Sequence, residues 1–150
     1  MTVERFLGLD WGRRRIGVAV SDPLGITAQP EAVWENVDEK EIAQKLIQLI
    51  ESKNIQRIVV GCPLNLRGIK GKSADQAEKF VKRLRRHISV PIDLWDERLT
   101  TVQAHRSLHQ MNEKPSRNKG RVDAIAAALL LQNYLDYMKD RLKQNKKENG

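Results

Sequence analysis

The sequence predicts an α/β fold in which a central mixed five-stranded sheet is flanked by helices. Three observations predict it: strand-like segments come first, strand–helix units follow, and a long apolar helix comes last. The 150 residues fit one domain. We expect that domain over residues 1–142, followed by a charged, flexible tail at residues 143–150.

The first half of the sheet is predicted by short apolar runs separated by turn signals. Phe6–Leu9 is apolar and ends at Asp10, and Gly12–Arg15 is typical of a turn. Residues 16–20 alternate between branched apolar and small side chains, so a second strand should form a hairpin with the first. A third strand is expected between residues 26 and 34.

Two strand–helix units are predicted next, each helix opened by a capping pair. Asp38 with Glu41 marks one helix start, and Ser73 with Gln76 marks the other. The expected elements are a helix from Asp38 to about Lys53, a strand at 57–61, a loop at 62–72, a helix from Ser73 to about Ile88, and a strand at 90–95.

Two helices are predicted to complete the chain. Thr100 begins one that reaches about Met111, and residues 112–120 form a polar, basic loop. The last helix begins at about Arg121 and is apolar on nearly every face between Val122 and Leu131. A helix of that composition should be buried in the middle of the fold.

The charge balance favours a polyanionic partner. The chain has 27 basic and 19 acidic residues, so its net charge is 27 − 19 = +8. Nucleic acid is such a partner, although solubility alone explains a basic chain equally well. No membrane partner is expected, because the longest apolar run, Ala124–Leu131, is far shorter than the roughly 20 residues of a membrane span.

The redox and targeting signals predict a cytoplasmic protein. Cys62 is the one cysteine, so no disulfide can form within the chain. The first ten residues carry charges and lack the apolar region of a signal peptide.

Three acids occupy positions where an α/β fold concentrates function. Asp10 ends the first strand, Glu97 follows the last strand, and Asp123 lies in the first turn of the last helix. Ligands usually bind at the carboxyl ends of strands in an open sheet. If the first and last strands are neighbours, and the last helix packs over them, the three carboxylates converge.

Converging carboxylates would repel one another and lose hydration. One or two Mg²⁺ or Mn²⁺ ions would remove that penalty, since hard cations prefer oxygen ligands. A pair of such ions can activate water and stabilise the leaving oxygen of a phosphodiester.

Each acid also has a structural explanation without function. Asp10 could close the hairpin turn, and Asp123 is favourable near a helix N-terminus because of the helix dipole. Glu97 could be a solvated ion-pair group beside Arg98. Only the combination of the three favours a metal site.

Basic and polar groups near these acids are candidates for phosphate contacts, with solvated turns and loops as the alternative explanation. They are Arg13, Arg14, Arg15, Asn65, Lys70, Lys72, Arg98, Lys114, Arg117, Lys119 and Arg121. The sequence Gly71-Lys72-Ser73 imitates a nucleotide-binding loop, but Leu66 occupies the position of its first glycine.

Four segments together resemble the YqgF/RuvX family of pre-16S rRNA nucleases and Holliday-junction-resolvase-like proteins. They are LGLDWGRRRIGVAVSD (7–22), VVGCPLNLRGIKG (59–71), DERLTT (96–101) and RVDAIAAALLLQNYL (121–135). The resemblance spans nearly the whole chain. It implies a ribonuclease H-like fold, with Asp10, Glu97 and Asp123 as the catalytic, metal-binding acids.

The resemblance also implies a function and partners. The expected function is metal-dependent phosphodiester hydrolysis that processes the 5′ end of pre-16S rRNA in ribosome biogenesis. The alternatives are a Holliday-junction resolvase acting on branched DNA and a non-catalytic RNA-binding ribosome assembly factor. Association with a ribosome precursor, as a monomer or weak homodimer, is expected.

Some features depart from the family pattern or fit a second class of protein. Arg14 stands where a lysine is common, and Trp11 and Cys62 replace other side chains. Related resolvases carry four acids, for which Asp22 and Asp96 are the further candidates. The first segment also resembles the first phosphate motif of actin-like and sugar kinases, but that class needs two related domains closing on ATP.

Overall fold

The structure is a computed structural model that describes residues 4–36, 38–62, 71–96 and 119–148. Within these ranges, the side chains of residues 73, 119–122 and 143–148 are outside the description. The elements are β1 (Arg5–Trp11), β2 (Arg15–Ser21), β3 (Ala28–Glu35), α1 (Glu39–Lys53), β4 (Ile55–Cys62), α2 (Lys72–Leu84), β5 (Ile92–Asp96) and α4 (Lys119–Glu148). The helix expected at 100–111 lies outside the described residues.

The five strands form one mixed sheet in the order β3-β2-β1-β4-β5. β1 and β2 pair antiparallel, as do β2 and β3, whereas β1–β4 and β4–β5 are parallel. The predicted hairpin and mixed sheet are therefore confirmed. The idea that the first and last strands are neighbours is wrong, because β4 pairs with β1 on one side and with β5 on the other.

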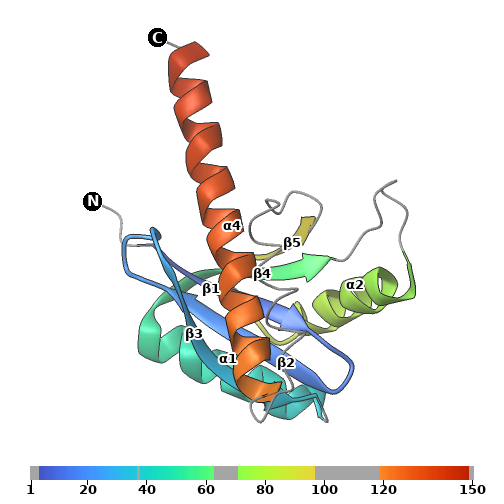
Figure 1. Ribbon diagram of the computed structural model, residues 1–150. Helices are drawn as coiled ribbons and strands as arrows, with labels where there is room; N and C mark the ends of the chain where they lie inside the picture. Colours follow the sequence, from blue (N-terminus) through green and yellow to red (C-terminus); the bar gives the residue numbers. More distant parts are fainter. Residues whose placement is uncertain (1–3, 37, 63–70, 97–118, 149–150) are drawn as a thin grey trace.

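Helices cover both faces of the sheet (Figure 1). α1 and α2 pack on one face, where Leu7, Leu9 and Val18 join the core with Leu46 and Phe80. α4 crosses the other face, where its alanines and leucines pack with Ala19, Val59 and Trp95 of the sheet. Because side chains alternate along a strand, every second side chain in each strand of the hairpin faces α4.

α4 packs unusually close to the sheet because glycines face it. A Cβ atom added to Gly8 would lie 2.8 Å from the Cβ of Leu131 and 3.3 Å from the carbonyl oxygen of Ala127. Every residue of α4 from 123 to 135 is buried or half-buried. The prediction of a buried last helix is confirmed over this part.

The helix starts differ in how they are capped. Asp38 caps α1 as predicted, with its side chain accepting a hydrogen bond from the amide of Lys40. The capping pair predicted at Ser73 is wrong: α2 begins at Lys72, and its N-cap is Gly71 in an extended conformation without a side-chain cap. Glycine is tolerated at the N-cap position, so the helix begins one residue before the serine.

Other boundaries also differ from the prediction; α2, for example, ends at Leu84 and not at about Ile88. β2 begins at Arg15, which makes Arg15 a strand residue rather than part of the turn. α4 begins at Lys119 and continues to Glu148, so the helical backbone passes residue 142, where the domain was expected to end. Lys, Gln and Glu have good helix propensity, which suits this extension.

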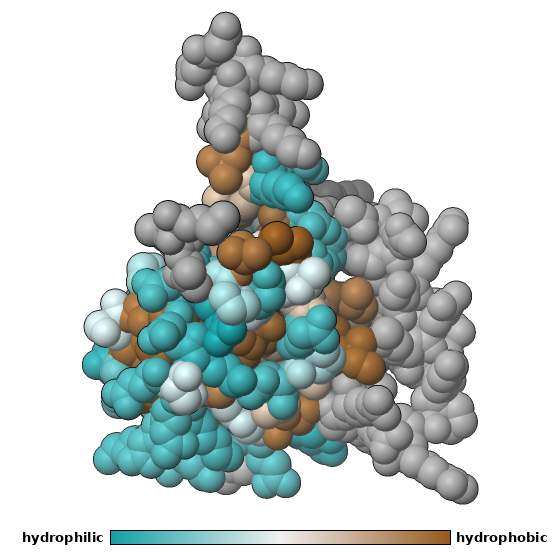
Figure 2. Space-filling view, turned by 90° about the vertical axis from the view of Figure 1, so that its left-hand side faces the viewer, coloured by the Kyte–Doolittle hydropathy of each residue, from teal (hydrophilic) through white to brown (hydrophobic). Residues whose placement is uncertain are grey.

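The surface turned to the viewer in Figure 2 is largely hydrophilic, with apolar surface near the place where α4 leaves the body of the domain. A groove of about 670 Å³ opens beside this part of α4. Its exposed apolar lining residues are Leu24, Ile26, Met138 and Leu142. In the described part of the chain, no helix is both long and apolar enough to cross a membrane.

Candidate functional site

β1 carries Asp10 to the edge of the sheet where the parallel strands end. Asp10 is the second-last residue of β1, and β4 and β5 end at Cys62 and Asp96, which are register partners. Leu9 is fully buried in the core under α1 and α2, so strand alternation turns Asp10 toward α4. Its register partner in β2 is Gly17.

The N-terminal part of α4 rests on that glycine at Asp123. Asp123 is the fifth residue of the helix and not in its first turn as predicted, because α4 begins at Lys119. The ideal Cβ position of Gly17 would overlap the carbonyl oxygen of Asp123, so only a glycine permits this approach. The contact fixes Asp123 over β2 at the level of Asp10. The structure thereby brings together two of the three predicted acids.

The two carboxylates are close enough to influence each other. The pKa of Asp10 is raised from 3.8 to about 6, first because burial disfavours the ionised form and second because the charge of Asp123 repels it. A carboxylate in this state gains stability from a nearby cation. Oxygen donors of this kind suit Mg²⁺ or Mn²⁺, so the residues fit the expected metal.

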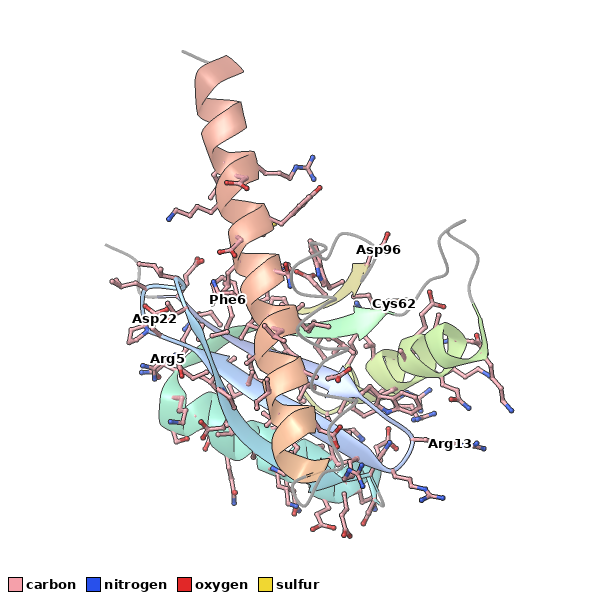
Figure 3. All side chains as sticks on the ribbon, viewed as in Figure 1. Arg5, Phe6, Arg13, Asp22, Cys62 and Asp96 are labelled. Carbon is pink, nitrogen blue, oxygen red and sulfur yellow. The ribbon has the colours of Figure 1, made fainter. Side chains whose placement is uncertain are left out.

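Arg15 makes the most direct contact with this pair. Its Nε donates to Oδ2 of Asp123 at 2.7 Å, and the two side chains are 39% and 30% exposed. Arg13 and Arg14 are exposed at the hairpin tip, where Arg13 points away from α4 (Figure 3). The structure therefore separates Arg15 from the other two arginines, which the sequence grouped together.

The hairpin tip is held by a residue that the sequence analysis missed. The side-chain amide of Asn36 donates to the carbonyl of Gly12 at 2.8 Å, and its backbone amide donates to the carbonyl of Arg14 at 2.8 Å. These bonds tie the β1–β2 turn to the end of β3. An asparagine directly after a predicted strand is a weak signal, because many turns contain one.

Asp22 does not belong to the site. It lies at the opposite end of the hairpin from Arg13 (Figure 3). Its carboxylate accepts hydrogen bonds from the backbone amides of Leu24, Ile26 and Thr27, which lower its pKa. Its role as a fourth acid is therefore wrong, because it closes the β2–β3 turn. Asp96 ends β5 at the same sheet edge as Asp10, with β4 between them.

The other predicted site residues are only partly described. Lys72 is exposed at the start of α2. Lys119 and Arg121 lie in α4, but their side chains are outside the description. The residues outside the described ranges are Glu97, Asn65, Lys70, Arg98, Lys114 and Arg117. Without Glu97, the described residues include no group of three side chains that could hold a metal.

The apolar groove beside α4 lies at the other edge of the sheet. Arg57, Asp93 and Tyr134 lie among its lining residues, and Arg57 pairs with Asp93 at 2.6 Å. None of the predicted site residues is among the lining residues that the structure describes. The groove and the candidate acids therefore lie at opposite ends of the strands.

The sheet order and the flanking helices define a ribonuclease H-like domain, with a pair of acids at the edge where its parallel strands end. Two structures of RuvC from Thermus thermophilus share this fold. The one in complex with a Holliday junction substrate has a TM-score of 0.57 at 14% identity, covering 89% of this chain and 96% of RuvC. The other has a TM-score of 0.51 at 15% identity, with the same coverage.

The chain belongs to the RuvX family, whose model, described as Holliday junction resolvase, matches residues 4–137. A relative from Ruminiclostridium cellulolyticum is 42% identical over 95% of this chain and 99% of its own length. A second, from Halothermothrix orenii, is 40% identical over 89% of this chain and 95% of its own length. Both are named "Putative pre-16S rRNA nuclease". The predictions of a ribonuclease H-like fold and of membership in this nuclease family are confirmed.

Proposed function

We propose that this chain is a metal-dependent nuclease whose centre is built from Asp10, Asp123 and Glu97. The observation that carries the proposal is the meeting of Asp10 and Asp123 at the sheet edge, where burial and mutual repulsion raise the pKa of Asp10 to about 6. Two carboxylates are held together there at a cost in free energy, which suits a site that binds one or two Mg²⁺ or Mn²⁺ ions.

The residues of the proposed centre would have separate roles in binding the cation and in binding the nucleic acid. Asp10 and Asp123, joined by Glu97, would hold the cation. Bound divalent ions would supply activation of water and stabilisation of the leaving oxygen. Arg13 and Arg14, exposed at the hairpin tip, would contact phosphates on either side of the cleaved bond. The backbone of α4 against Gly17 would keep the two acids at a constant separation.

Structured RNA, and specifically pre-16S rRNA in the cytoplasm, is the substrate we favour. The names of the relatives support this choice, and the net charge of +8 suits a polyanion. The description of the family supports a four-way DNA junction as the second candidate. Both substrates carry the same phosphodiester, so the same acids would serve either one.

Cleavage assays with matched variants test the proposal. Wild type, Asp10→Asn and Asp22→Asn would each be incubated with end-labelled pre-16S rRNA and with a four-way DNA junction, in Mg²⁺, Mn²⁺ or EDTA. Asp22→Asn is the control, because it removes an equal charge at the far end of the hairpin. We expect divalent-dependent cleavage of RNA by wild type and Asp22→Asn, and none by Asp10→Asn.

The other outcomes are informative. Preferential cleavage of the junction would replace RNA with branched DNA as the substrate. RNA binding without cleavage in any metal would overturn the nuclease proposal in favour of an assembly factor.

A further inference from the structure

We infer that Arg15 is a positioning residue of the metal centre, which orients the Asp123 carboxylate for the cation instead of gripping nucleic acid. The inference rests on the proposed function. Arg15 contributes a single bond, from Nε to Oδ2 of Asp123 at 2.7 Å. This bond uses Oδ2 of Asp123, so a cation would bind through the other oxygen, Oδ1.

The backbone makes Arg15 suited to this role and its neighbours unsuited. Arg15 is the first residue of β2 and pairs with Glu35 of β3, whereas Arg13 and Arg14 belong to the exposed turn. Strand alternation places Arg15 on the same face as Gly17, two positions along, which is the face that α4 covers. Its side chain therefore starts from a fixed backbone position beside Asp123.

The energetics favour a role of Arg15 in orienting the Asp123 carboxylate over a role in stabilising the fold. Both side chains of the pair are about one-third exposed, and such ion pairs contribute little to stability, roughly 0–1 kcal/mol. The positive charge of Arg15 beside Asp123 also offsets the repulsion between Asp123 and Asp10 before any cation binds. Removing a side chain that hydrogen-bonds to a metal ligand and holds it in place typically changes metal affinity or activity by about 10- to 100-fold.

The direct test measures Mn²⁺ affinity without nucleic acid, by electron paramagnetic resonance or calorimetry. Wild type would be compared with Arg15→Met and Arg15→Lys, and with Arg13→Met and Arg14→Met as controls of equal charge change. We expect Arg15→Met to weaken Mn²⁺ binding by about tenfold. Arg15→Lys should recover part of the affinity, and the two controls should remain within about twofold of wild type. Thermal melts would check that all variants fold.

Kinetics provide the second readout. Arg15→Met should lower kcat at limiting Mn²⁺ and regain activity at high Mn²⁺, whereas Arg13→Met and Arg14→Met should raise KM for nucleic acid. Mn²⁺ affinity in Arg15→Met that equals or exceeds that of the controls would overturn the positioning role. Equal Mn²⁺ affinity in wild type and Asp10→Asn would overturn the metal centre itself, and the inference with it.

Discussion

Gly17 lies directly against the backbone carbonyl of Asp123, and this contact sets how close α4 comes to the sheet. Gly17 is also the register partner of Asp10. One glycine therefore controls the separation of two acids that belong to opposite ends of the chain. Any larger side chain at this position must push α4 away, because the obstacle is backbone and cannot rotate aside.

Gly17→Ala should therefore damage both stability and activity. We expect a loss of about 2–3 kcal/mol in the free energy of unfolding, as for other overpacked contacts, together with loss of cleavage. Urea denaturation and the cleavage assay would measure the two effects. Gly71→Ala is the matched control, because a Cβ there meets no atom within 4 Å. A Gly17→Ala protein with wild-type stability would contradict this account of the contact.

Asp10→Asn should stabilise the metal-free protein at neutral and higher pH. Because the pKa of Asp10 is raised to about 6, the folded state binds more protons than the unfolded state between about pH 4 and 6. The contribution of Asp10 to stability therefore falls as the pH rises through this window. Above it, the variant should be more stable than wild type by about 2–3 kcal/mol.

Melting curves in EDTA at pH 4, 6 and 8 would measure this difference. The gap between Asp10→Asn and wild type should be small at pH 4 and largest at pH 8. A gap that is constant with pH would mean that the pKa of Asp10 is not raised in the folded protein.

Divalent cations should stabilise the wild type more at pH 8 than at pH 5. At pH 5 Asp10 is mostly protonated, and a cation must displace that proton to bind. A ligand that binds only the folded state raises the melting temperature, and the rise increases with the logarithm of its affinity at a given concentration. The shift produced by Mn²⁺ should be larger at pH 8 and should disappear in Asp10→Asn. Equal shifts at both pH values would argue against Asp10 as a ligand.

Asp22→Asn should behave in the opposite way from Asp10→Asn. Backbone amides lower the pKa of Asp22, so its contribution to stability is present above its unfolded pKa of about 3.8 and is lost as the pH falls through the lower folded value. We expect the variant to be about 0.5–1 kcal/mol less stable at pH 7, with the difference shrinking below about pH 4. Cleavage should remain at the wild-type level.

Local patterns predicted most of the fold correctly. Alternating residues identified the hairpin, and short branched runs identified β4 and β5, because a half-buried or buried strand must place its side chains in that way. Asp38 was correctly recognised as a cap, since its interaction is confined to the next helical turn. The cap at Ser73 failed because Gly71, two positions earlier, can start the same helix.

The candidate site was predicted only in part. The sequence singled out Asp10 and Asp123 because an acid at a strand end and another near a helix start are visible in local order, although α4 begins four residues before Asp123. It did not distinguish Arg15 from Arg13 and Arg14, and it left Asp22 as a candidate acid. These assignments depend on which end of its strand each residue occupies. Because β1 and β2 are antiparallel, the start of β2 lies beside the end of β1, and the end of β2 lies far from it.

The sequence by itself determined the class of fold, the family and the candidate residues for a cation site, because these follow from short-range periodicity and from motifs. Only the tertiary structure decided that β4 separates β1 from β5, that Gly17 admits the backbone of Asp123, and that Arg15 pairs with that acid. The two contacts of Asp123 join segments more than 100 residues apart in the chain, and the strand order joins segments that are also distant in sequence. Packing and charge select such contacts once the sheet and α4 have come together.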